Sequence, residues 1–138
     1  MTTADRIMRS VLIADDDDFC RESLREIVEP EGFRAVLASS GEEALDIIKD
    51  EPIHLGLFDL QMPRMSGLET VQLVHQINAL LPCILVTGNA TQEVIRQAFQ
   101  VRVYSVIPKP VSKQVLLYTM LRALKAYEEL LGDEPETE

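Results

Sequence analysis

Five polar side chains in this sequence each follow a short apolar run. Asp15 and Asp16 come directly after VLIA, Asp59 after HLGLF, Thr87 after CILV, and Lys109 after YSVI by way of a proline. Carboxylates that leave room for water are poor ligands for soft metals and suit Mg²⁺. A cation would relieve the repulsion between adjacent carboxylates and would neutralise a phosphoryl group, whose oxygens a lysine and a threonine can bind. Asp59 stands alone at the end of its run and is the natural nucleophile, because a carboxylate can form an acyl phosphate.

The apolar runs predict the elements that would bring these side chains together. Short runs rich in Val, Ile and Leu alternate with longer segments of helical period; they lie at 11–14, 35–38, 54–58, 83–86 and 104–107. Strands that are apolar on both faces and separated by helices indicate a parallel sheet covered on both sides, here an α/β fold of the (βα)5 type. Because the carboxyl ends of parallel strands share one edge of the sheet, we expect the five side chains to converge there.

Capping residues predict where the helices begin: Asp18 for a helix that runs to Glu29, Ser40 with Glu43, Ser66 with Glu69, Thr91 and Ser112. The two Ser–Glu pairs fit the capping box, in which a hydroxyl and a carboxylate satisfy free amide donors reciprocally. The last helix is predicted over 112–131, about 30 Å at 1.5 Å per residue. It carries an apolar stripe formed by Leu116, Met120, Ala123, Tyr127 and Leu130.

Composition limits the class of protein. A chain of 138 residues with 46% hydrophobic content suits one domain. The net charge of −10 argues against direct binding of nucleic acid, and no apolar run is long enough for a membrane span, so we expect a soluble, cytoplasmic protein. Cys20 and Cys83 are expected to be reduced, buried thiols. His75 could accept a phosphoryl group, but a lone helical histidine is usually a packing or surface residue.

Acidic residues at strand ends are also common as caps and solvated turns, and this is the expected role of Asp17 and Asp18. Each candidate position taken alone favours such a structural role. Their joint placement at the correct strand ends favours chemistry.

Four segments, in order, resemble the receiver domain of two-component response regulators: VLIADDDDFCRESL, LFDLQMPRMSGLE, ILVTG and VIPKP. The resemblance covers roughly residues 9–125. It implies a flavodoxin-like doubly wound sheet of five parallel strands in the order 2-1-3-4-5. The match leaves residues 1–8 as an N-terminal extension and 126–138 as a C-terminal helix extension with an acidic tail, which its composition predicts to be disordered.

The resemblance assigns a role to each candidate residue. Asp59 would be the phosphorylated aspartate, Asp16 a direct Mg²⁺ ligand and Asp15 a ligand chiefly through water, while Gln61 would offer its backbone carbonyl to the metal. Two further residues, Thr87 and Lys109, would bind the phosphoryl oxygens, and the Lys109–Pro110 bond would be cis. The phosphoryl donor would be a sensor histidine kinase or phosphotransfer protein, and loss by hydrolysis would be slow. The output would pass through the face of the fourth helix, fifth strand and fifth helix to an effector that the sequence does not name.

Two positions depart from the family pattern. Val106 replaces the aromatic residue whose rotamer usually follows the threonine, and strand alternation would put Tyr104 on the same face. Arg102 stands where a glycine usually supplies a positive φ, which indicates a remodelled or strained connection. The resemblance also implies a role for Gln61 and Asn89. They occupy the positions that, in this family, influence the access of the water that hydrolyses the phosphoryl group.

Three alternatives stay open at this stage. The second half of the last helix could form a homodimer contact or a linker. A phosphatase of the haloacid dehalogenase type uses a similar set of side chains, but its D-x-D-x-T/V motif would need Thr or Val at Phe19. A degenerate receiver acting as a scaffold would not need the intact acidic set, Thr87 and Lys109. The main hypothesis is therefore a signalling phosphoacceptor that is not an enzyme.

Overall fold

One parallel sheet organises the chain. The computed structural model describes residues 8–132, so most of the predicted N-terminal extension and the acidic tail lie outside the described residues. The sheet has five strands in the order β2-β1-β3-β4-β5, which confirms the predicted topology. Every predicted strand is present to within one residue: β1 (Ser10–Ala14), β2 (Arg34–Ala38), β3 (Leu55–Asp59), β4 (Cys83–Thr87) and β5 (Ser105–Pro108).

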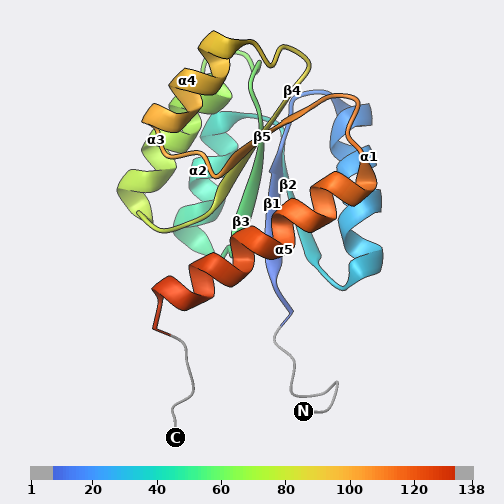
Figure 1. The fold of residues 1–138 in the computed structure, drawn as a ribbon, viewed down its shortest axis with the longest axis vertical. Coiled ribbons are helices and arrows are strands. Elements are labelled where there is room, and N and C mark those ends of the chain that lie inside the picture. Colours follow the sequence, from blue (N-terminus) through green and yellow to red (C-terminus); the bar gives the residue numbers. More distant parts are fainter. Residues whose placement is uncertain (1–7, 133–138) are drawn as a thin grey trace, which may run out of the picture.

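Five helices cover both faces of the sheet: α1 (Asp18–Val28), α2 (Gly41–Asp50), α3 (Gly67–Ile77), α4 (Gln92–Gln100) and α5 (Lys113–Leu130), with a short 3₁₀ helix η2 (Glu29–Glu31) after α1. Figure 1 shows α2, α3 and α4 on one side of the sheet and α1 with α5 on the other. Alternate strand residues belong to two separate cores. Leu12 packs on the side of α2, α3 and α4, and Ile13 packs on the side of α1 and α5. This follows from the two-residue period of a strand.

The helix caps agree with the sequence except for the residue that caps α1 and the capping box predicted at α2. Asp17, and not Asp18, caps α1, because its side chain accepts a hydrogen bond from the amide of Cys20. Ser40 caps α2 as predicted, but the Glu43 carboxylate accepts from the amide of Ser39, so no capping box closes there. The capping box at the start of α3 is complete, and α4 and α5 begin after their predicted hydroxyl caps.

Helix α5 is slightly shorter than predicted, with 18 residues. Its stripe is buried in the first half, whereas Tyr127 is half-buried and Leu130 is 66% exposed. The end of the helix still contacts the domain, because Glu128 pairs with Arg9 and the Tyr127 hydroxyl accepts from Asn78. The apolar stripe therefore packs on the core only over its first three members.

Several smaller predictions can be compared with the described residues. Arg102 has a φ of +64°, which confirms the strained connection after α4. Both cysteines are free, and Cys83 is buried, but Cys20 is only partly so. His75 is a buried packing residue whose ring nitrogens lie 3.1 and 3.0 Å from two carbonyl oxygens. Among the described helices, none combines the length and apolar character needed to cross a membrane.

Candidate functional site

The register of the sheet brings the candidate residues to one edge. Ala14 is the partner of Phe58 in the β1–β3 ladder, so the next residues, Asp15 and Asp59, emerge side by side. Thr87 ends β4, next to the strand of Asp59, and its register partner in β5 is the residue just before Lys109. Parallel pairing thus places two carboxylates, a hydroxyl and an ammonium at the carboxyl ends of neighbouring strands, as the sequence predicted.

Lys109 joins the two buried carboxylates. Its Nζ lies 2.9 Å from Oδ1 of Asp59 and 3.2 Å from Oδ2 of Asp15. The side chain of Asp15 is 1% exposed and that of Asp59 10%, whereas that of Lys109 is 24% exposed. Such poorly solvated charges require a counter-charge, and a single ammonium cannot balance two carboxylates.

Asp16 adds a third carboxylate to this group. Oxygen atoms of Asp15, Asp16 and Asp59 lie within 4.8 Å of one another, with Asp16 exposed at the mouth. With Lys109 included, the group of three carboxylates still has two negative charges in excess. A hard divalent cation fits this donor set, since all three groups are oxygen ligands and the exposed side leaves room for water.

The aspartate run divides into two parts. Asp15 and Asp16 belong to the acidic cluster, whereas Asp17 caps α1 and Asp18 is exposed and paired with Arg21. The amide of Asp17 also donates to Oδ1 of Asp15 at 2.9 Å. The cap therefore helps to orient a buried carboxylate of the cluster.

Burial changes the protonation chemistry of the cluster. Desolvation is the main cause that raises the pKa of Asp59, and the charges of Asp15 and Asp16 add to it against the hydrogen bond from Lys109. Burial opposes the charge on Lys109, yet its hydrogen bond to Asp59 and the charge of Asp15 raise its pKa above the ordinary value. The lysine therefore stays charged at neutral pH, and burial makes the ionised form of Asp59 more costly than it would be in water.

Two further predicted site residues lie at or just beyond the ends of the strands that lead to the site. The Thr87 hydroxyl is buried and accepts from the amide of Asn89 at 3.0 Å, which orients it at the end of β4. Gln61 lies two residues beyond Asp59, in the exposed start of the loop that leads to α3. The position of its carbonyl relative to the cluster stays a prediction.

Two residues that position the site were missed in the sequence. Arg21 is mostly buried, and its Nη1 donates to the carbonyl of Asp15 at 2.7 Å while its other nitrogen pairs with Asp18. Gly67 begins α3 close to the strand that carries Asp59, because a Cβ there would lie 2.2 Å from the carbonyl oxygen of Asp59. The glycine was visible in the DLQMPRMSG segment, but only the fold reveals what it approaches.

Comparison with known proteins agrees with this geometry. The model of the response regulator receiver domain matches residues 11–121. The chain belongs to the response regulator receiver family. Receiver domains of this kind act in two-component signalling, and the acidic pocket described above is the expected feature of the fold.

Similar proteins support the assignment at the level of the domain. Response regulator RR06 of Streptococcus pneumoniae is 33% identical over 115 residues, which cover 83% of this chain and 52% of that protein. Transcriptional regulatory protein CpxR of Escherichia coli is 31% identical over 110 residues, covering 80% and 47%. A CheY-like receiver domain structure from Methanospirillum hungatei superposes with a TM-score of 0.85 at 31% identity, covering 89% and 98%. The chain thus spans about half the length of RR06 and of CpxR.

The raised pKa of Asp59 predicts a pH-dependent difference in stability. Its folded-state pKa lies above the unfolded value, so the ionised side chain destabilises the fold above that pKa, and the penalty disappears as pH falls through it. In a chelating buffer, Asp59→Asn should therefore raise the free energy of unfolding at pH 7 by roughly 0.5–2 kcal/mol. Urea unfolding at several pH values should show this difference shrinking towards pH 4. A gain that stays constant with pH would contradict the assignment.

Proposed function

We propose that this receiver domain is phosphorylated on Asp59 by a phosphohistidine donor. The observation that carries the proposal is the buried Asp59 carboxylate held 2.9 Å from the Lys109 ammonium inside an acidic cluster. A carboxylate oxygen of Asp59 would attack phosphorus, the P–N bond of the donor would break, and its electron pair would return to the imidazole. The product is an acyl phosphate on Asp59.

The residues of the cluster have separate roles in this step. Lys109 would leave Asp59 and bind a phosphoryl oxygen, remaining paired with Asp15. The Thr87 hydroxyl, already oriented by the Asn89 amide, would donate to a second oxygen. Both contacts stabilise charge that spreads over the transferring group.

We assign the metal site to Asp15, Asp16, Asp59 and the backbone carbonyl of Gln61, with Mg²⁺ as the cation. When bound, the ion neutralises charge on the carboxylates and on the phosphoryl oxygens. The fit rests on three oxygen donors within 4.8 Å and on the excess negative charge that Lys109 leaves. Asp15 and Asp16 would otherwise repel the anionic donor.

The proposed role is signalling and not turnover of a substrate. The donor would be a sensor histidine kinase or a phosphotransfer protein in the cytoplasm, and the phosphoryl group would be lost only slowly. The domain would extend over 9–125, and its output would pass through α4, β5 and α5 to an effector protein. Homodimerisation through α5 is a second possible outcome, since Leu130 and Leu131 are exposed at its end.

Intact-mass measurement tests this function. Wild-type protein incubated with Mg²⁺ and acetyl phosphate should gain one phosphoryl group, and the gain should disappear when the Mg²⁺ is chelated. Steady release of phosphate from p-nitrophenyl phosphate would instead indicate a phosphatase, particularly if changing Asp17 stopped it. Failure of the wild-type protein to gain mass with both Mg²⁺ and acetyl phosphate present would reject the proposal.

Arg21 should matter for the metal without contacting it. Arg21→Ala removes the donor that holds the Asp15 carbonyl, so repulsion among the aspartates can move the loop. We expect Mg²⁺ affinity to fall roughly 10-fold or more, as for other residues that support metal ligands. Isothermal titration with Mg²⁺ measures this, and Asp18→Asn is the matched control, since it loses the ion pair but keeps the carbonyl contact. Equal affinities for wild type and Arg21→Ala would exclude the role.

A further inference from the structure

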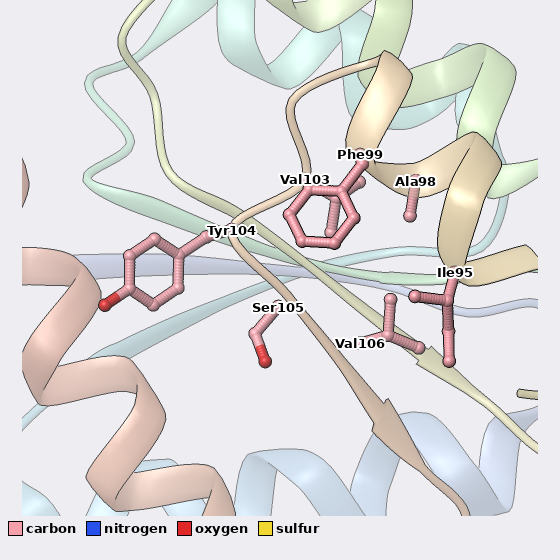
Figure 2. Close-up of a pocket in the computed structure, with 7 residues that line it drawn as sticks. All are labelled: Ile95, Ala98, Phe99, Val103, Tyr104, Ser105 and Val106. Atoms are coloured by element: carbon pink, nitrogen blue, oxygen red, sulfur yellow. The ribbon is translucent and has the colours of Figure 1, made fainter. Parts of the chain in front are cut away.

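A groove of about 200 Å³ lies beside β5, at the edge of the sheet next to α4. Figure 2 shows Ile95 and Phe99 reaching it from α4, with Val103 and Val106 on the chain that enters β5. Phe99 is 73% exposed and Ile95 38%. Large apolar side chains therefore border the groove, and water covers them in the isolated domain.

The groove is open because two side chains do not fill it. Val106 packs against the core cluster beneath α4 and is much smaller than an aromatic residue. Tyr104 was expected to share its face, but Figure 2 shows the Tyr104 ring directed towards α5 and away from Val106. That prediction is wrong, because Tyr104 precedes β5 and does not follow the alternation of the strand.

Charge is distributed unevenly along the chain. Residues 8–91 contain six Lys or Arg and 15 Asp or Glu, whereas residues 92–132, without Lys109 of the acidic cluster, contain five Lys or Arg and only three Asp or Glu. The second group forms α4, β5 and α5, so the elements around the groove are basic in an acidic protein. A surface of this kind attracts acidic partners. The same basic surface of a second copy would repel it.

Two arginines are neighbours of residues that line the groove: Arg102 precedes Val103, and Arg122 interacts with Tyr104. Arg102 is exposed directly after α4, one residue before Val103. Arg122 on α5 lies over the Tyr118 ring at 5.6 Å, and the hydroxyls of Tyr118 and Tyr104 raise its pKa. Within residues 8–132, the recorded ion pairs include neither guanidinium. Both charges are thus available to a ligand.

We propose that the groove binds an acidic protein segment that inserts one large apolar side chain, Phe or Leu, between α4 and β5. Carboxylates flanking this anchor would pair with Arg102 and Arg122. The anchor would occupy the space that Val106 and Tyr104 leave open. A symmetric contact between two copies would instead bring two basic surfaces together, which like-charge repulsion opposes.

This inference rests on the proposed function, since it gives the chemistry of the partner on the proposed output face. It also concerns the segment that the partner contributes, and not the phosphoryl transfer itself. The contact would lie on the β4–β5 pair, where Val106 is the register partner of Leu85 and Thr87 follows two residues later. An occupant of the groove would therefore contact the strand pair that ends at the site.

Selection from a displayed library of random short peptides tests the proposal. The bait is the full chain with Mg²⁺ and beryllofluoride, and in parallel without them. We expect enriched peptides to carry Asp or Glu on both sides of a single Phe or Leu. Neutral or basic peptides, or no enrichment in either condition, would overturn the proposal.

Substitutions locate the binding of a selected, labelled peptide. Val106→Phe should fill the groove and weaken binding about 10-fold or more, whereas Val115→Phe, the same change on exposed α5, should not. Arg102→Glu and Arg122→Glu should each weaken binding several-fold and reduce its salt dependence, with Arg25→Glu on α1 as the control. Urea unfolding checks that each variant is folded. Peptide affinity that is unchanged by Val106→Phe, or unchanged by both charge reversals, would disprove the assigned site.

Two further measurements separate the possible failures. Light scattering of the same samples shows whether a second copy of the chain occupies the groove. A dimer that Arg122→Glu dissociates would overturn the proposal that the occupant is an acidic segment of another protein. Intact mass after acetyl phosphate treatment reports on the proposed function. Normal phosphorylation without acidic peptide binding would reject only the inference about the groove.

Discussion

Asp59→Asn is expected to abolish phosphorylation by acetyl phosphate, whereas the wild-type chain should gain one phosphoryl group. The amide of asparagine cannot supply the anionic oxygen that forms the acyl phosphate. The variant keeps the shape of a side chain that is only 10% exposed, so the fold around it should persist. Intact-mass spectrometry with Mg²⁺ present measures the effect, and the expected residual signal is indistinguishable from that of a blank.

The matched control is Asp18→Asn, the same chemical change three positions after the first residue of the cluster. Asp18 is exposed and lies outside the group of three carboxylates. Its phosphorylation should match that of wild type to within about twofold, as expected for a surface substitution. Phosphorylation that survives in Asp59→Asn would mean that another residue accepts the group, and peptide mapping would identify it.

Lys109→Ala should separate metal binding from phosphoryl transfer. Without the ammonium, the phosphoryl oxygens lose one charged donor, and we expect the phosphorylation rate to fall about 10²-fold or more. Mg²⁺ should nevertheless bind more tightly, because a positive charge that contacts both Asp15 and Asp59 has been removed. Mass measurements over time and isothermal titration give the two quantities.

The same variant should be unstable in a way that Mg²⁺ corrects. Two carboxylates that are nearly buried lose their cation, which costs roughly 3 kcal/mol of unfolding free energy in chelating buffer. Added Mg²⁺ should recover most of this loss, so its stabilising effect should exceed that in wild type. Lys113→Ala, which removes an exposed lysine at the start of α5, should show neither effect. Weaker Mg²⁺ binding in Lys109→Ala would contradict the proposed metal site.

Much of the fold was predictable because short apolar runs specify buried parallel strands. Each strand was located to within one residue, and the strand order followed from the family resemblance. The cluster of Asp15, Asp59 and Lys109 was equally predictable, since the ends of neighbouring parallel strands must meet at one edge. The cis Lys109–Pro110 bond, expected from the resemblance, is also present.

Local geometry was less predictable than strand position. Asp17 and Asp18 are both acceptable caps by residue type, and only the backbone at Asp17, which is extended, selects between them. Glu43 has the spacing of a capping box, yet its carboxylate reaches Ser39. Such choices depend on alternative local conformations that differ little in energy, so sequence spacing alone does not resolve them.

The sequence by itself determined the order of the elements, the family and the identity of the acidic cluster, because periodicity and strand ends are local properties. Only the tertiary structure revealed the support from Arg21 and Gly67, the direction of Tyr104 and the groove beside Val106. These features depend on where long side chains reach and on how closely separate elements approach. Contacts between residues distant in sequence, such as the ion pair of Arg9 with Glu128, arise only when the helices have packed on the sheet.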